Sequence, residues 1–217
     1  MPNSILAARR PWDARLARRL VTPLVATWVS PNHVTTLRLG VGLAAAAAFT
    51  PGSYGWSNLA ALLLILSNFL DHADGELARL SGKTSRVGHL YDLVSDAAVT
   101  VWLFMAIGVG VAAQPGIDLA VAPAILGLVA GTAVALIFYL RMRTEAVLGK
   151  AATRLASLGG FETEDVLYLL PVATLCNALT PLLLAASICA PLYAIWVAID
   201  YQRLRRRDRR MAIGVAR

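Results

Sequence analysis

Charged side chains are scarce in this 217-residue sequence, at 15% of all residues, whereas 58% of the residues are hydrophobic and the mean hydropathy is +0.63. That balance supplies far more apolar surface than one water-soluble core of this length needs. Only two cysteines occur, Cys176 and Cys189, and neither belongs to a Cys-x-x-Cys pair, which argues against a disulfide framework or a thiolate metal site. The N-terminus lacks an apolar stretch followed by a small-residue cleavage site, so we expect no removable signal peptide. The composition therefore favours a membrane protein.

Lysine and arginine are missing altogether from three long stretches of the chain. These stretches are 39–78, 87–140 and 155–202. Each is long enough for two helices of about 20 residues, the length that crosses a hydrocarbon core of about 30 Å. Each also has a turn signal near its middle. The turn signals are "TPGSYGWSN" at 50–58, "AQPGID" at 113–118 and "NALTP" at 177–181. The sequence therefore predicts three helical hairpins.

The predicted fold is all-α, a membrane bundle of six transmembrane helices. The approximate spans are 33–50, 56–78, 88–112, 119–141, 164–179 and 182–202. Of the 20 Lys and Arg residues, 18 fall in four clusters around the gaps, namely Arg9 to Arg19, Arg79 to Arg86, Arg141 to Arg154, and Arg203 to Arg210. Basic residues mark cytoplasmic loops, so we expect both termini to be cytoplasmic, in a protein of the plasma membrane.

The ends of the chain differ in character from the predicted six-span domain, residues 31–202. In residues 1–30, a hydrophobic residue recurs every fourth position with arginines between, which favours an amphipathic helix lying in the cytoplasmic interface. The pattern consists of Trp12, Leu16, Leu20 and Leu24 with Arg15, Arg18 and Arg19. A basic leader that only sets orientation is the alternative. The basic tail, 203–217, reads as a positive-inside anchor, and no folded module accompanies it that would read nucleic acid.

Four aspartates stand out against this apolar background. Asp71 and Asp74 are three residues apart near the end of the second predicted span, and Asp92 and Asp96 are four apart near the start of the third, so each pair occupies one helix face. The short link between the spans should bring the two faces together. Four converging carboxylates repel each other and are costly in a membrane span, so a compensating charge is required. An all-oxygen ligand set suits Mg²⁺ or Mn²⁺, and carboxylates from two helices could hold two ions.

The residues around the aspartates are suited to a phosphate group. Gly75 follows Asp74 and Ala78 lies one turn on, which leaves that helix face without bulk. Arg79 ends the apolar run at the cytoplasmic surface, where its guanidinium could pair with phosphate in a bidentate fork. Gly88 begins the third span on the same side, and either close helix packing or ligand access would explain it.

These positions together resemble the signature of the CDP-alcohol phosphotransferase family, D-x-x-D-G-x-x-A-R, eight residues, then G-x-x-x-D-x-x-x-D. All eight fixed residues are filled between 71 and 96. The segment "PNHVTTLRL" at 31–39 also resembles the family's Pro-Asn-x-x-Thr entry into its first span. The resemblance implies transfer of a phosphate-linked group from a CDP-alcohol, with CDP-diacylglycerol expected first, to an acceptor hydroxyl, with release of CMP.

The resemblance also implies roles for individual residues. The four aspartates would bind a centre of two Mg²⁺ or Mn²⁺ ions, in which Asp71, Asp74 and Asp92 would hold metal, and Asp96 would contact metal and act as the general base. The cytidine diphosphate would face Gly75, Ala78, Arg79 and Gly88, and the resemblance also implies a homodimer. A basic cluster could hold an anionic acceptor, or simply follow the positive-inside rule; its members are Arg141, Arg143, Lys150 and Arg154. The pair Gly127 and Gly131 is consistent with either a dimer face or packing within the chain.

Three alternatives remain open. A soluble CDP-inositol-like donor would use the same chemistry, and Glu76 in "DGELAR" is similar to relatives with such donors. A membrane prenyltransferase shares the N-x-x-D-x-x-D pattern of "NFLDHAD", but such enzymes have a second aspartate motif much later in the chain, and no Asp-rich segment follows Asp96. An ion-coupled transporter also buries acidic residues, yet has no need of the Gly-Ala-Arg part of the signature.

Overall fold

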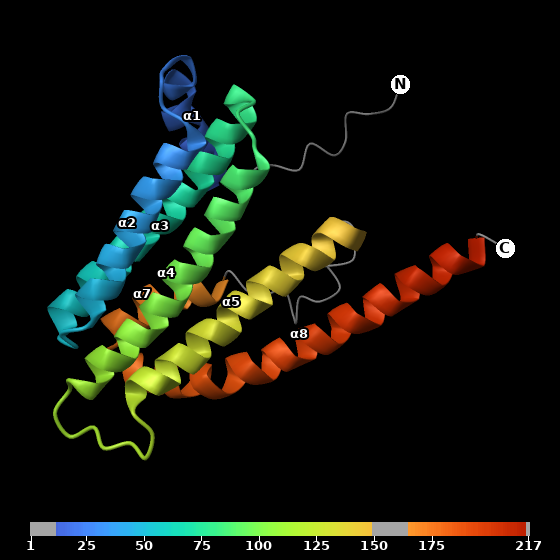
Figure 1. Ribbon diagram of the computed structural model, residues 1–217. Coiled ribbons are helices and arrows are strands. Elements are labelled where there is room, and N and C mark those ends of the chain that lie inside the picture. The colour runs from blue at the N-terminus through green and yellow to red at the C-terminus, as the bar shows by residue number, and fades with distance from the viewer. Residues whose placement is uncertain (1–11, 149–164, 216–217) are drawn as a thin grey trace.

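The structure is a computed structural model that describes residues 12–148 and 165–215, and this part of the chain is helical with no strand. Its elements in order are α1 (Trp12–Val21), the 3-10 helix η1 (Thr22–Ala26), α2 (Pro31–Phe49), α3 (Tyr54–Ser81), α4 (Arg86–Ala112), α5 (Pro123–Leu148), α7 (Asp165–Leu175) and α8 (Leu179–Val215). Figure 1 shows α2, α3 and α4 side by side, while α5 and α8 diverge from them toward the right. The all-α prediction is confirmed.

The connections between α2 and α3, α4 and α5, and α7 and α8 lie together at one end of the molecule, the lower end in Figure 1. The Gln114 side chain joins them, because its Nε2 donates to the Gly52 carbonyl at 3.4 Å and its Oε1 accepts from Thr180 Oγ1 at 3.4 Å. All three predicted turn segments contain a residue with positive φ, namely Gly52 (66°), Gly116 (78°) and Asn177 (52°). Gly and Asn tolerate this conformation, which explains why the chain reverses at these points.

Three of the described helices are long and apolar enough to cross a membrane. They are Arg86–Ala112 in α4, Pro123–Ala146 in α5 and Leu179–Arg207 in α8. Helices α2 and α3 coincide closely with the first two predicted spans, but they do not meet this standard, and α7 has 11 described residues against about 20 for a span. These three helices support the prediction of a membrane protein, and the six-span count stays a prediction.

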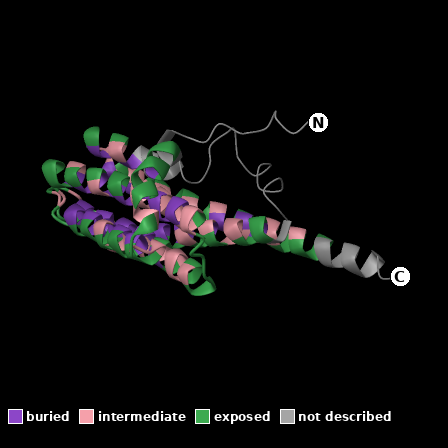
Figure 2. Ribbon diagram, turned by 90° about the horizontal axis from the view of Figure 1, so that it is seen from above, coloured by how far each residue is buried: buried purple, intermediate pink, exposed green. Residues whose placement is uncertain are grey.

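The outer surface of the bundle carries large apolar side chains on most helices. Leu62, Trp102 and Leu192, from α3, α4 and α8, are each more than half exposed. Figure 2 shows buried residues along the inward faces of the helices and exposed residues along the outward faces. A soluble protein rarely exposes so much contiguous apolar surface, whereas lipid tails solvate it well.

The main core lies between α2, α3, α4, α7 and α8, does not include the aspartates, and contains Phe49, Leu64, Leu103 and Leu183. Small residues allow α5 to approach α4 closely. A Cβ atom on Gly127 would lie 2.1 Å from the Phe104 carbonyl oxygen, and one on Gly131 would lie 2.9 Å from Val101 Cα. Both glycines therefore serve packing within the chain, which is one of the two predicted roles for this pair.

Helix α1 packs on the end of α3 through a small apolar face. Ala17 and Val21 are buried against α2 and α3 residues, including Val34, Ala73 and Leu77. Of the predicted stripe, Leu16 and Leu20 are exposed, as are the arginines Arg15, Arg18 and Arg19, whereas Leu24 is partly buried against the same cluster. A helix is therefore present where the sequence predicted one, and its position in a membrane interface stays a prediction.

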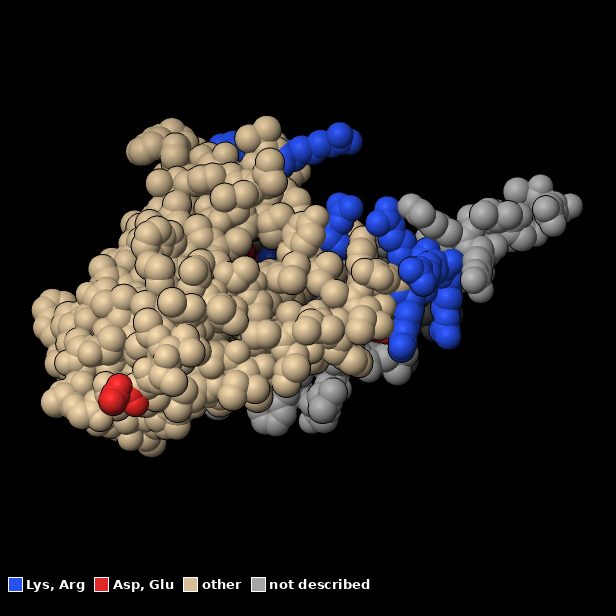
Figure 3. All heavy atoms as spheres, turned by 60° about the horizontal axis from the view of Figure 1, so that its bottom comes forward, with Lys and Arg blue, Asp and Glu red and all other residues tan. Residues whose placement is uncertain are grey.

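Positive charge is concentrated away from the connections. In Figure 3, where the lower end comes forward, most of the visible surface is uncharged, and the Lys and Arg side chains appear at its upper edge and on its right-hand side. This separation follows the sequence, since 39–78, 87–140 and 155–202 contain no Lys or Arg.

Candidate active site

The aspartates are brought together by the short connection between α3 and α4. Helix α3 ends at Gly82, which takes the left-handed conformation (φ 67°) that glycine favours at a helix C-terminus. Helix α4 begins after Ser85, whose Oγ accepts a hydrogen bond from the Gly88 amide at 2.9 Å and so caps the helix. The chain reverses within four residues, at the upper end of α3 and α4 in Figure 1, and this reversal brings the two predicted aspartate pairs toward each other.

Three carboxylates of the signature form a compact group. Asp71, Asp74 and Asp92 each offer an oxygen, and these oxygens all lie within 4.8 Å of one another. Asp74 is buried, and Oδ1 of Asp92 is buried without a hydrogen-bond partner. An acceptor of this kind is costly unless something binds it. Three converging carboxylates, one with an oxygen that accepts no hydrogen bond, fit a hard divalent cation such as Mg²⁺ or Mn²⁺.

Arg38 of α2 lies at the centre of the four aspartates, although its side chain is only 2% exposed. Its guanidinium pairs with Asp71 and with Asp96, and Nη1 lies 3.1 Å from Asp92 Oδ1 and 4.0 Å from Asp74 Oδ2. The position relative to Asp92 lacks hydrogen-bond geometry, so that oxygen stays without a donor. Asp96 therefore joins the other aspartates through Arg38 and is not part of the three-carboxylate group.

Further polar side chains of α2 and α3 support Asp74 and Arg38. The Thr35 hydroxyl donates to Asp74 Oδ2 at 2.8 Å, within a buried environment. Ser67 Oγ donates to the Arg38 carbonyl at 3.1 Å. The start of α2 is fixed by a capping box between Ser30 and His33. Thr35 is the threonine of the Pro-Asn-x-x-Thr segment, so that segment forms a wall of the site.

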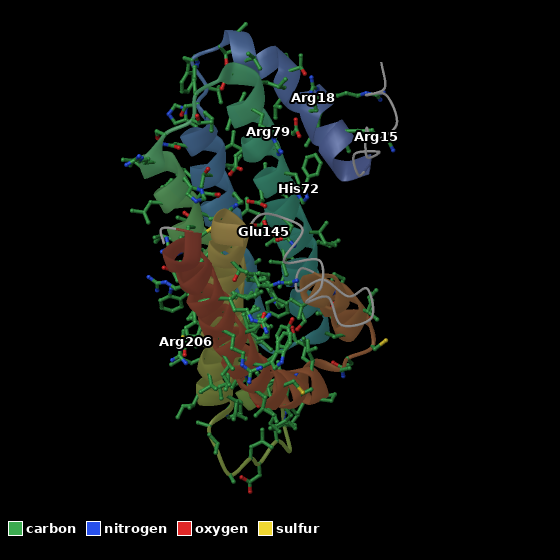
Figure 4. The ribbon with its side chains drawn as sticks, turned by 90° about the vertical axis from the view of Figure 1, so that its right-hand side faces the viewer. Arg15, Arg18, His72, Arg79, Glu145 and Arg206 are labelled. Carbon is green, nitrogen blue, oxygen red and sulfur yellow. The ribbon has the colours of Figure 1, made fainter. Side chains whose placement is uncertain are left out.

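Arg79 lies on the last turn of α3 with its side chain largely exposed, and it folds back along its own helix. Its Nε donates to the Gly75 carbonyl at 3.1 Å, and Nη2 lies 3.4 Å from Glu76. Buried Glu76 is also 4.0 Å from Arg18 of α1, and Figure 4 shows Arg18 and Arg79 at the same end of the molecule. Glu76 therefore connects α1 to Arg79, a role that its variable position in the signature does not reveal.

The remaining predicted donor-site residues differ in their surroundings. A Cβ atom on Gly75 would meet only the flexible end of Arg79, 3.2 Å away, so the face beside Asp74 is open. Ala78 lies one turn on and is partly buried. Gly88 has a packing role, because a Cβ atom there would lie 2.9 Å from Asn32 Oδ1 at the start of α2.

The predicted acceptor site is described only in part. Arg141 is partly buried and Arg143 is exposed on α5, whereas Lys150 and Arg154 lie outside the described residues. Figure 4 shows Glu145 on the same helix, somewhat below His72 of α3. An acceptor role for the basic residues stays a prediction.

The arrangement of helices is similar to that of solved structures. A crystal structure of Mycobacterium tuberculosis phosphatidylinositol phosphate synthase with CDP-DAG bound superposes with a TM-score of 0.63 at 20% identity, covering 87% of this chain and 92% of that one. The same protein in complex with manganese and citrate gives a TM-score of 0.53 at 22% identity, covering 85% of this chain and 88% of that one. The fold is therefore shared.

Similar sequences are found among transferases. The chain is 34% identical over 152 residues to a Rubrobacter xylanophilus "Bifunctional IPC transferase and DIPP synthase", covering 66% of this chain and 30% of that protein. It is also 34% identical over 103 residues to Danio rerio cholinephosphotransferase 1, covering 42% of this chain and 26% of that protein. The chain thus spans less than a third of the length of these relatives. The family model for CDP-alcohol phosphatidyltransferase matches residues 28–201, which contain the whole aspartate cluster and Arg38, so the chain belongs to the CDP-alcohol phosphatidyltransferase family.

Proposed function

We propose that this protein transfers a phosphatidyl group from CDP-diacylglycerol to the hydroxyl of a small alcohol or polyol, releasing CMP, in phospholipid biosynthesis. The observation that carries the proposal is the group formed by Asp71, Asp74 and Asp92, whose oxygens lie within 4.8 Å of one another, in a chain of this family. Large apolar side chains exposed on most of the helices also suit a donor that resides in the membrane.

The three clustered carboxylates would hold the divalent cation. When bound, such an ion supplies positive charge that stabilises the departing diphosphate oxygen. Thr35 keeps Asp74 oriented by donating a hydrogen bond to it, and the connection at Gly82 keeps Asp92 opposite Asp71. These residues act by holding the carboxylates in position, because the metal ligands must be in place before the donor binds.

The donor diphosphate would lie over Gly75 and beside Arg79. The absence of a side chain at Gly75 admits a phosphate group close to the backbone, and the exposed guanidinium of Arg79 can turn from Glu76 toward it. Asp96, the most exposed of the four aspartates, would accept the proton of the attacking hydroxyl. Arg141 and Arg143 are the described candidates for contacts to a phosphorylated acceptor.

A soluble CDP-inositol-like donor is the second candidate, since it would use the same aspartate cluster. Glu76, the residue that pointed to this option, is buried and paired with Arg79, so it would act on either donor through Arg79. The choice between donors therefore depends on the surface around Gly75 and Ala78 and not on Glu76 itself.

The proposed setting is the plasma membrane, with six spans and with both termini and the aspartates cytoplasmic, where CDP-alcohols are available. The gathering of the three connections at the end that lacks Lys and Arg supports this orientation. We also propose a homodimer with one complete site in each chain, because a single signature supplies a full ligand set.

The proposal is tested with purified protein, two donors and a set of acceptors. CDP-diacylglycerol and CDP-inositol are each combined with a polyol, a polyol phosphate, serine and an aminoalcohol in the presence of Mg²⁺ or Mn²⁺. Release of CMP and the mass of the product identify the pair of substrates. Transfer from a prenyl diphosphate with both CDP-donors inert would replace this proposal with a prenyltransferase, and ion uptake without CMP release would replace it with a transporter.

A further inference from the structure

Helix α1 contacts the proposed donor site through Glu76, a buried carboxylate whose two oxygens face arginines from different helices. Oε1 lies 3.4 Å from Arg79 Nη2 on α3, and Oε2 lies 4.0 Å from Arg18 Nη1 on α1. We propose that Arg18 is a positioning residue for donor binding, because it keeps a cation beside Glu76 when Arg79 leaves that carboxylate for the diphosphate. The docking of α1 thereby sets the affinity for the donor. This inference rests on the proposed function, since it takes the donor diphosphate as the second partner of Arg79.

The position of Arg18 follows from the packing of α1 on α3. Ala17, the residue before it, is buried in an apolar cluster with Ala73 and Leu77 of α3. Those two α3 residues lie one turn before Glu76 and directly after it, so the apolar contact places α1 over the buried carboxylate. Arg18 is therefore held near Glu76 by packing, and its place there does not depend on Arg79.

Arg79 is the member of this group that can change partners. Its side chain is 66% exposed, whereas that of Glu76 is 3% exposed. Its guanidinium also borders the open face of Gly75, because a Cβ atom on that glycine would lie 3.2 Å from Nη2. A diphosphate over Gly75 would meet this guanidinium directly, and it offers a bidentate pairing that the 3.4 Å contact to Glu76 does not. Binding of the donor thus draws Arg79 away from Glu76.

The exchange is unfavourable for Glu76 unless another cation stays beside it. A buried carboxylate that loses a paired cation is strongly destabilised. Arg18 remains on the other side of this carboxylate, and 47% of its side chain is exposed, so it has room to move closer than 4.0 Å. A chain with Arg18 can therefore release Arg79 to the diphosphate more easily than a chain without it.

The test is a double-mutant cycle on the purified full chain in detergent, with CDP in the presence of Mn²⁺ as the probe and calorimetry as the measurement. Arg18→Gln should weaken CDP binding by about 3- to 10-fold, the scale of coupling between neighbouring charges. In a Glu76→Gln background no buried charge is left at that position, so the same change at Arg18 should alter CDP affinity by less than about twofold.

Two further variants separate charge from shape on α1. Arg19→Gln removes an exposed charge from the same turn of the helix and is the matched control, which should bind CDP like wild type. Arg18→Lys keeps a cation near Glu76 and should recover most of the affinity that Arg18→Gln loses. If Glu76→Gln does not fold, this pair of variants still decides, because an Arg18→Lys chain that binds CDP as weakly as Arg18→Gln would contradict a role for the charge.

Equal CDP affinity in Arg18→Gln, Arg19→Gln and wild type would overturn the inference while leaving the proposed function intact. A loss of the same size with and without Glu76 would also overturn it, because the effect would then not pass through that carboxylate. Unchanged CDP binding in Arg79→Gln would overturn it as well, since Arg79 would have no second partner. Absence of both CDP binding and CMP release in wild type would instead remove the proposed function together with this inference.

Discussion

Asp96 is the most exposed of the four aspartates, with 53% of its side chain accessible, and it pairs with the Nη2 end of Arg38. If it accepts the proton of the acceptor hydroxyl, Asp96→Asn should lower turnover by about 10²- to 10⁴-fold, the usual contribution of a positioned base. Donor affinity should survive, since Asp96 lies outside the three-carboxylate group. Calorimetry with the CDP-donor, beside CMP release rates, separates the two effects. If Asp96→Asn lost as much donor binding as Asp71→Asn, Asp96 would be chiefly a metal ligand and not a general base.

Thr35 donates a buried hydrogen bond to Asp74 at 2.8 Å. Thr35→Val keeps the shape of the side chain but leaves a buried carboxylate oxygen without its donor, so we expect a loss of about 1 to 3 kcal/mol in unfolding free energy. The matched control is Thr132→Val, whose hydroxyl is exposed and bonds only to the Leu128 carbonyl within its own helix. Thermal unfolding in detergent with EDTA measures the stability of both variants relative to wild type. Equal stability of the two variants would mean that the Thr35 bond contributes little.

The sequence predicted the aspartates but not Arg38, and the reason lies in the separation of the partners. Asp71 and Asp74 share a helix face by their spacing, and a short link brings Asp92 to them, so local geometry predicts the cluster. Arg38 is 33 residues from Asp71 and 58 from Asp96, and no spacing rule relates them. The available signal was energetic: a lone arginine between long stretches without Lys or Arg must find an acidic partner.

At the scale of the elements, glycines set the distance between helices α4 and α5. A Cβ atom on Gly127 would lie 2.1 Å from the Phe104 carbonyl oxygen, which is backbone and cannot move aside easily. Gly127→Ala should therefore lower the thermal midpoint. Gly40→Ala is the control, because nothing lies within 4 Å of its Cβ position in α2, and alanine there should hold or raise stability by up to about 1 kcal/mol. If Gly127→Ala left the thermal midpoint unchanged, α5 would have to lie farther from α4 than it does in the structure.

Helix positions were predictable where the chain carries strong local signals, and less so elsewhere. The turns at Gly52, Gly116 and Asn177 fall inside the predicted segments because these residues accept positive φ. The fourth predicted span began at 119, whereas α5 begins at Pro123, a residue preorganised for the first helical turn. Helix α8 continues beyond the predicted end at 202 to Val215, since arginine is a good helix former and no Gly or Pro interrupts the basic run.

At the scale of the whole molecule, the charge distribution predicts orientation in the membrane. In a background where Cys176 and Cys189 are replaced, single cysteines at Ser53 and Asp118 should react with an impermeant reagent in intact cells, because both are exposed at the end that lacks Lys and Arg. A cysteine at exposed Lys83, beside the aspartates, should react only after permeabilisation. Labelling of the Lys83 position in intact cells would place the site on the wrong side for cytoplasmic CDP-alcohols.

The central claim is that the carboxylate group at the α3–α4 reversal carries out transfer from a CDP-alcohol. The most direct measurement compares CMP release from the best donor and acceptor by wild type, Asp92→Asn and Asp118→Asn, in saturating Mn²⁺. Asp92 has the buried oxygen without a hydrogen bond, and Asp118 is an exposed aspartate in the connection at the opposite end. We predict that Asp92→Asn loses about 10²-fold or more, the scale for removing one electrostatic stabiliser of a transition state, while Asp118→Asn keeps the wild-type rate. Wild-type turnover in Asp92→Asn, in a chain that remains folded, would contradict the account.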